Sequence, residues 1–258
     1  MMNLLRADFA RLCKSPALWR SLIGMLALAA AFMVMQATAM DYTVPLSRVI
    51  FLPMSLYGIA MAALVSAFVG GDFAGGFIRN KLLTAKSRGV IVLSSMIASA
   101  TACLVVYLIV TAFTAGVGRF FFENNVKPAD FWRFFALGAG MSLVTGSLFA
   151  VIAMLSGNPA RAALWCVGLA CGMLLLCLHT NEILVQPEYR DGVLNPHYVG
   201  GFRRTLCSLL HDLNPCGQAA QLSAWEVWHP VRAQMFNLIT MILSAVLGCR
   251  LFHEKDID

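Results

Sequence analysis

The sequence predicts an all-α membrane protein that crosses a lipid bilayer six times, and two observations predict it. Apolar residues make up 59% of the 258 residues and charged residues 12%, whereas an average soluble domain has about 45–50% and about 25%. Six stretches also approach or exceed the roughly 20 mostly apolar residues that a transmembrane helix needs. They are residues 22–40, 49–70, 90–118, 134–157, 163–179 and 231–252, and none contains an acidic residue. We expect them to form one domain over residues 1–258.

The first stretch is expected to remain in the protein as a span. Basic residues precede it, as they precede the core of a secretory signal peptide. It is longer, however, than the usual signal core of about 7–15 residues. In addition, no small-residue cleavage site is followed by a soluble domain. We therefore expect a retained transmembrane helix.

The connections between the stretches carry most of the basic residues and predict the orientation. Lys and Arg in short loops favour the cytoplasmic side. Eleven of the 19 fall on the side of the N-terminal segment, while eight of the 13 acidic residues fall on the other side. We therefore expect both termini in the cytoplasm. Because the net charge of +6 lies in the connections, it suits a membrane surface, and we expect no nucleic-acid partner.

Residues 1–21 are expected to form a cytoplasmic amphipathic helix before the first span. Leu5, Phe9 and Leu12 recur at helical spacing on one face, and charged residues lie elsewhere. Pro16 is expected to end or bend the helix, because proline lacks an amide hydrogen and restricts the residue before it. Such a helix lies flat on a membrane surface. It serves either as an anchor or as a surface for a partner, and the pattern does not choose between these roles.

Residues 71–89 are expected to form a polar, basic cytoplasmic loop, which begins where Gly75 and Gly76 end the second span. A charged loop is usually a solvated connection. This loop is longer than two neighbouring helices need, and its apolar residues allow a short surface helix. It is therefore either a solvated connection or a docking segment.

Residues 180–230 are expected to form an extracellular connection that contains a second amphipathic helix. Its apolar face is formed by Phe202, Leu206, Leu209, Leu210 and Leu213. The Asn-Pro pair at residues 214–215 is expected to end this helix. Cys207 and Cys216 also lie in this connection. They either form a disulfide, if the compartment is oxidising, or stay as two free thiols.

Three spans carry small residues at every fourth position, a pattern that lets transmembrane helices approach closely. These residues are Gly58, Ala62 and Ser66 in the second span, Gly138, Ser142 and Gly146 in the fourth, and Gly168 and Gly172 in the fifth. We expect these rows to pack against other helices. The pattern does not say whether those helices belong to the same chain.

The spans lack the residue types that several chemistries need. No ionisable residue lies at depth to bind a coupling proton or sodium ion. No HExxH or GxSxG motif supplies a metal site or an activated nucleophile, and the five histidines lack metal-ligand spacing. We expect no enzyme activity, catalytic residue, metal or cofactor on this chain. A GxxxxGK[ST] loop is also missing from the sequence, so ATP, if it is used, must bind another chain.

Three segments give the chain a resemblance to a known family. They are MNLLRADFARLCKSPALWR at residues 2–20, GDFAGGFIRNKLLTAKSRGVIVLS at residues 71–94 and LNPCGQ at residues 213–218. Together with the six spans, they resemble the membrane subunit of ABC-2 type exporters, in particular the small six-span permeases of bacterial drug, peptide-antibiotic and bacteriocin-immunity systems. The resemblance covers essentially the whole chain.

This resemblance implies roles for particular segments. Residues 72–88 would be the coupling helix that docks on an ATPase, with basic residues that face the ATPase or lipid phosphates. The basic residues are Arg79, Lys81, Lys86 and Arg88. The same segment includes the acidic Asp72, where many relatives have Glu. Residues 4–14 would be the connecting helix beside the dock, with Arg6, Phe9, Arg11 and Leu12. The helix that contains Phe202, Leu206, Leu209 and Leu213 would lie near the extracellular gate.

The resemblance also implies an assembly. Two permease subunits, identical or different, would face one another in the bacterial cell membrane, in contact with membrane lipid. Each would bind a cytoplasmic ABC ATPase that holds ATP and Mg²⁺. Together they would export an amphiphilic or hydrophobic compound, such as a peptide antibiotic, a drug or a lipid. From the residues alone, a non-transporting membrane sensor, immunity protein or structural subunit stays open as the alternative.

Overall fold

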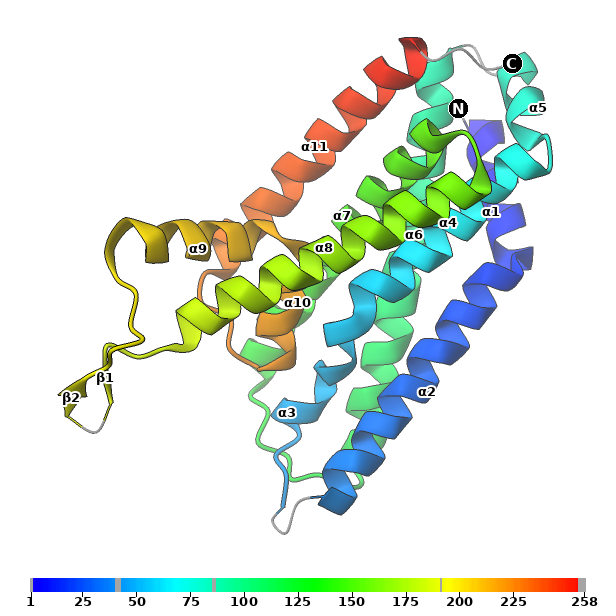
Figure 1. The fold of residues 1–258 in the computed structure, drawn as a ribbon. Coiled ribbons are helices and arrows are strands. Elements are labelled where there is room, and N and C mark those ends of the chain that lie inside the picture. The colour runs from blue at the N-terminus through cyan, green and yellow to red at the C-terminus, as the bar shows by residue number, and fades with distance from the viewer. Residues whose placement is uncertain (1, 40–42, 85–86, 191, 255–258) are drawn as a thin grey trace.

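The computed structural model describes residues 2–39, 43–84, 87–190 and 192–254 and is almost wholly helical (Figure 1). Six helical segments are long and apolar enough to cross a membrane. They are Pro16–Ala39 (α2), Ser47–Ala74 (α3, η1 and α4), Arg88–Gly118 (α6), Pro128–Ser156 (α7), Pro159–Val185 (α8) and Pro230–Glu254 (α11). The predicted all-α fold with six spans is confirmed, and the chain is a multi-pass membrane protein.

The remaining elements are short helices and one two-stranded antiparallel hairpin. They are α1 (Met2–Lys14), α5 (Phe77–Thr84), β1 (Tyr189–Arg190), β2 (Val193–Leu194), α9 (Gly201–Leu213) and α10 (Pro215–Ser223). Figure 1 shows α1, α5 and the last turns of α11 gathered at one end of the bundle, which we call the terminal end. The β-hairpin and α3 lie toward the opposite end, which we call the hairpin end.

The second span is not the continuous helix expected over residues 49–70. It begins with α3 (Ser47–Ile50), continues as the 3-10 helix η1 (Leu52–Leu56) and becomes a regular α-helix only in α4 (Tyr57–Ala74). Pro53 explains the change, because proline has no amide hydrogen to donate within an α-helix. The predicted end of the span is confirmed, since α4 stops just before the glycine pair. Gly76 has a φ of +68°, which favours glycine.

The small residues of the fourth span pack within the chain, where α7 crosses α6. A Cβ atom added at Gly146 would lie 2.6 Å from the Cα atom of Ala100 on α6. At Gly138 an added Cβ atom would meet the ring of Tyr107, which also lies on α6. Ser142, between these two glycines, is buried. Residues with larger side chains would therefore hold α6 and α7 further apart.

The row on the second span also packs within the chain, whereas the row on the fifth span does not. A Cβ atom added at Gly58 would lie 3.0 Å from the sulfur atom of a cysteine on α10. Ala62 and Ser66 are buried. A Cβ atom added at Gly168 or Gly172 would meet no described atom within 4 Å. This part of α8 therefore faces away from its own bundle.

The connection between the fifth and sixth spans folds back into the bundle. The expectation of an extracellular connection did not include this. Helix α10 packs against η1, α7 and α8, and its residues Gln218 and Leu222 are fully buried. Asn214 starts this helix, because its side chain accepts a hydrogen bond from the Cys216 N–H at 3.0 Å. The same side chain donates to a carbonyl oxygen of α8 at 2.7 Å. Residues 201–223 thus form a re-entrant hairpin of two helices.

Candidate functional site

Four charged side chains meet at the terminal end and form a buried ion cluster that consists of Asp8, Arg11, Asp72 and Lys81. The Lys81 Nζ atom lies 2.7 Å from Asp8 Oδ1 and 2.6 Å from Asp72 Oδ2, and Arg11 pairs with Asp72. The side chains of Asp8, Asp72 and Lys81 are 1%, 2% and 8% exposed, whereas that of Arg11, at the edge of the cluster, is 26% exposed. An unpaired charge would be costly to bury. The cluster avoids this cost because it matches two carboxylates with two cations.

Further contacts connect the ion cluster to two spans. Ser94 of α6 donates a hydrogen bond from Oγ to Asp8 Oδ2 at 2.7 Å. The Arg11 guanidinium lies 5.1 Å from the ring centroid of Phe68 on α4 and 4.9 Å from that of Phe77 on α5. Both distances lie within the range of cation–π attraction. The cluster therefore joins α1 and α5 to α4 and α6.

The local sequence explains how the short helices present these residues. Asp8 and Leu12 lie four residues apart in α1, so they share one face, and both are buried. Ile78 and Lys81 lie three residues apart in α5 and are likewise buried. The turn at Gly76 redirects the chain after α4, and α5 packs against α4 and α6. The faces of α1 and α5 that carry the charges are thus turned toward the bundle.

The expectation that Lys81 faces a partner or lipid phosphates is wrong. Its ammonium group is buried between Asp8 and Asp72. Asp8 was expected to lie off the apolar face with the other charged residues of the amphipathic helix, and it is instead fully buried. A signal was present, because the only acidic residues among the first 122 are Asp8, Asp41 and Asp72. An isolated acid in a strongly basic segment points to a specific cationic partner.

The other residues assigned to the coupling and connecting helices lie around the ion cluster. Arg6 and Arg79 are exposed, on α1 and α5 respectively. Phe9 is half-buried against the core. Arg88 begins α6, and its Nη1 atom donates to a carbonyl oxygen in the last turn of α11 at 3.1 Å. Lys86 lies outside the described residues.

A second polar network lies on the side of the bundle away from the ion cluster and joins α9, α10 and α11. Asp212 is buried, and it accepts hydrogen bonds from Arg232 Nε at 2.7 Å and from Gln221 Nε2 at 2.8 Å. Gln218 and Asn237 exchange two hydrogen bonds of 2.9 Å. A charge pair with a buried carboxylate and a buried amide pair therefore fix the re-entrant hairpin to the last span.

His211 is a buried histidine beside this network. Its Nδ1 atom lies 2.8 Å from Thr180 Oγ1 on α8, and its ring centroid lies 5.5 Å from that of Trp228. Its Nε2 atom has no hydrogen-bond partner among the residues that the structure describes. Burial lowers the pKa of His211, because it disfavours the imidazolium ion, while the neighbouring Asp212 acts in the opposite direction. His211 is therefore neutral near pH 7.

The predicted second amphipathic helix is present as α9, and its apolar face points away from the bundle. Of the five residues of that face, Phe202, Leu206, Leu209 and Leu213 are exposed and Leu210 is half-buried. The two cysteines of this region are both buried free thiols. Cys207 packs beside Ile183 and Leu184 of α8, whereas Cys216 lies on α10. Of the two alternatives for Cys207 and Cys216, the structure contains the free thiols.

Acidification is expected to loosen α9 from α8 through His211. When α9 is detached from α8, His211 is exposed to water and takes up a proton near its ordinary pKa of about 6.5. When α9 is packed against α8, burial keeps His211 neutral until a lower pH. The stabilising contribution of neutral His211 is therefore complete above that pKa and is lost as the pH falls below it, by up to about 1.4 kcal/mol per pH unit. Hydrogen exchange of the α9 amides at pH 7.5 and 5.5, corrected for intrinsic rates, measures this change.

The variant His211→Gln removes the titration and is expected to flatten the pH dependence of exchange in α9. The exposed His197 provides the matched control, because its side chain makes no contact with the network. His197→Gln should leave the pH dependence as it is in the unchanged protein. An equal pH dependence in the protein with and without His211 would contradict the prediction.

Comparison with known protein families and with characterised proteins gives no match for this sequence. The class of protein is therefore defined by the fold and the site. It is a polytopic α-helical membrane protein in which buried charges fasten two short helices to the spans at one end and a re-entrant hairpin packs into the other half.

Proposed function

We propose that the chain is the membrane-spanning permease subunit of an ABC exporter of the ABC-2 type. In this role it moves an amphiphilic or hydrophobic compound outward with energy from ATP hydrolysis on a separate ATPase subunit, which carries ATP and Mg²⁺. The observation that carries the proposal is the buried ion cluster. It makes α1 and α5 one unit with the ends of α4 and α6.

The ion cluster supports this function because it can transmit a movement of the short helix α5 to the spans. A soluble partner that contacts α5 would act on Lys81, which is bonded to Asp8 of α1 and Asp72 of α4. Buried ion pairs resist separation, since breaking one leaves an uncompensated charge. A movement of α5 is therefore expected to move the second and third spans with it, rather than bend the connection between them.

The charge around the cluster supports a soluble partner at the terminal end. Arg6, Lys14 and Arg79 are exposed there on the two short helices. Basic residues in short connections favour the cytoplasmic side of a bacterial cell membrane, where ATP is available. The exposed arginines would pair with acidic groups on the ATPase or with lipid phosphates.

A second permease subunit, identical or different, would complete the substrate path. The support comes from α8, where Gly168 and Gly172 face open space with the exposed Leu164 and Trp165 nearby on the helix. Glycines four residues apart let two transmembrane helices approach closely. The small-residue rows of the second and fourth spans already pack against helices of this chain. The row on α8 therefore remains for a helix of the partner subunit.

Charge reversal on α5 tests the proposal. Arg79→Glu places a carboxylate where the ATPase would dock and is expected to weaken its association by about tenfold or more, because like charges across an interface are strongly unfavourable. The exposed Arg203 of α9 gives a matched control, since Figure 1 shows α9 on a different side of the bundle from α5. Arg203→Glu should retain full association, as measured by co-purification with the ATPase and by its ATP hydrolysis.

Two outcomes would contradict the proposal. Unchanged ATPase association in the Arg79→Glu variant would remove α5 as the docking helix. A chain that purifies with no stoichiometric ATPase, and that alters no ATP hydrolysis, would favour a non-transporting sensor, immunity or structural subunit instead.

A further inference from the structure

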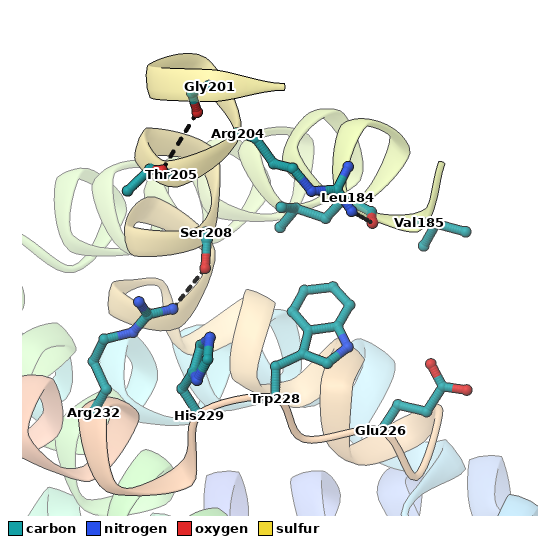
Figure 2. A pocket seen from close by; sticks show the side chains of 10 residues that line it. All are labelled: Leu184, Val185, Gly201, Arg204, Thr205, Ser208, Glu226, Trp228, His229 and Arg232. Atoms are coloured by element: carbon teal, nitrogen blue, oxygen red, sulfur yellow. Dashed lines mark hydrogen bonds between the residues drawn. The ribbon is translucent and has the colours of Figure 1, made fainter. Parts of the chain in front are cut away.

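A cavity of about 710 Å³ opens between α9, the end of α8 and the start of α11. Its polar lining comes from Arg204, Thr205 and Ser208 of α9 and from Glu226, His229 and Arg232 near α11, with Trp228 between them. Figure 2 shows Arg232 and Glu226 at opposite sides of this lining, with His229 and Trp228 between them. The lining thus has a cationic side at Arg232 and an anionic side at Glu226, while its second arginine, Arg204, donates to backbone carbonyl oxygens at the end of α8 and at Gln186.

The cationic side is fixed in place by the hairpin network. Arg232 donates from Nη2 to Ser208 Oγ at 2.6 Å and from Nε to Asp212 Oδ2 at 2.7 Å. Its Nη1 atom has no bond to any residue that the structure describes, and the same is true of the His229 ring. Asp212 neutralises the single charge of Arg232, so this side would hold a phosphate through the open Nη1 donor, the Ser208 hydroxyl and the His229 ring rather than through an excess of positive charge.

The anionic side holds two polar groups that the protein leaves without partners. Glu226 is exposed, and within the described chain its carboxylate forms no hydrogen bond or ion pair. The indole N–H of Trp228 is also without a partner there. A carboxylate and the face of an indole ring in one cavity lining attract a primary ammonium group, by charge and by cation–π contact, whereas the indole N–H is a donor that suits an oxygen of the ligand.

The last span, whose residue Arg232 lines the cavity, also carries an exposed apolar surface. Val231, Met235 and Leu238 are exposed and follow i, i+4, i+7 spacing, so they form one stripe on α11. Val185, at the end of α8, is an exposed apolar residue of the cavity wall itself. A ligand whose polar part fills the cavity can therefore lay acyl chains along α11.

We propose that this cavity binds the headgroup of a phospholipid that carries both a phosphate and a primary ammonium group, as phosphatidylethanolamine does. The phosphate lies against Arg232, Ser208 and His229. The ammonium group lies between Glu226 and the Trp228 ring, and the acyl chains follow the stripe on α11. The site belongs to the membrane leaflet at the end of α11 that begins with Pro230. It stands independently of any transport activity.

Lipid binding to the purified full-length chain in detergent tests the proposal. Native mass spectrometry would count bound short-chain phosphatidylethanolamine, phosphatidylcholine and phosphatidylglycerol in competition, with water-soluble glycerophosphoethanolamine as a fourth ligand. We expect phosphatidylethanolamine to be preferred over phosphatidylglycerol by roughly three- to fivefold, the size of one exposed charge contact with a cation–π contribution. The soluble headgroup should compete only weakly, because it lacks the acyl chains.

The variant Glu226→Gln removes the anionic side and should bring the two lipids to about equal binding, within roughly twofold. Glu226→Lys should invert the preference toward phosphatidylglycerol. Glu123 is an exposed glutamate outside the cavity, and Glu123→Gln should keep the original preference. The proposal is overturned if the unchanged protein prefers phosphatidylglycerol, if Glu226→Gln keeps the preference, or if glycerophosphoethanolamine competes as well as the lipid.

Discussion

Replacing Lys81 with methionine is expected to destabilise the folded chain by about 3–5 kcal/mol. Methionine has a similar length and helix propensity, so the change removes the charge and little else. It leaves Asp8 and Asp72 buried with Arg11 as their remaining cation in the cluster. The one remaining guanidinium group pairs with Asp72, so it does not compensate the buried charge of Asp8. Thermal or denaturant unfolding of the purified protein in detergent, followed by circular dichroism, measures the decrease in the free energy of unfolding.

Two further variants separate the loss of pairing from a general effect of removing a lysine. Lys127 is exposed at the start of α7, so Lys127→Met should stay within about 0.5 kcal/mol of the unchanged protein. In the double variant Asp8→Asn with Lys81→Met, the Arg11–Asp72 pair remains balanced, and part of the lost stability should return. If the double variant is less stable than Lys81→Met alone, pairing with Asp8 is not the cause.

The variant Gly146→Ala is expected to destabilise the chain by up to about 2 kcal/mol, although alanine is the better helix former. Alanine gains about 1 kcal/mol in intrinsic helix propensity, but overpacking of a close contact typically costs about 1–3 kcal/mol. Overpacking dominates here because the new methyl group would lie 2.6 Å from the Ala100 Cα atom and 2.7 Å from the Ser99 carbonyl oxygen. These are backbone atoms, which cannot rotate aside. The same unfolding measurement applies.

Gly116 gives the matched control for this substitution. It lies on α6, and a Cβ atom added there would meet no described atom within 4 Å. Gly116→Ala should therefore leave stability unchanged or raise it by up to about 1 kcal/mol. Equal effects at the two glycines would show that the close approach of α6 and α7 does not limit stability.

The spans could be predicted because their signal is local. Twenty or so apolar residues without an acid define a membrane helix wherever its neighbours lie, and all six were found. The break in the second span also has a local signal, since Pro53 stands inside it. Pro53 alone does not predict a break, because membrane helices tolerate proline when other groups satisfy the backbone.

The candidate site was predicted in part, because its segments have local patterns but its pairings do not. Amphipathic spacing located α1 and α9, and the glycine pair located the turn before α5. Nothing local indicates that Lys81 meets Asp8, 73 residues earlier in the chain. The burial of α10 is equally non-local, because it depends on space left by η1, α7 and α8. Its hydrophilic glutamines instead indicate a solvated turn.

The order in which the ion cluster forms has a consequence for how the chain is made. Asp8 leaves the ribosome long before Asp72, Lys81 and Ser94, the residues it is grouped or bonded with in the finished protein. Until those residues emerge, α1 must remain in contact with water or lipid headgroups, because its carboxylate has nothing to neutralise it in an apolar setting. The first span can therefore enter the membrane early, while α1 reaches its final position only after the third span has begun to insert.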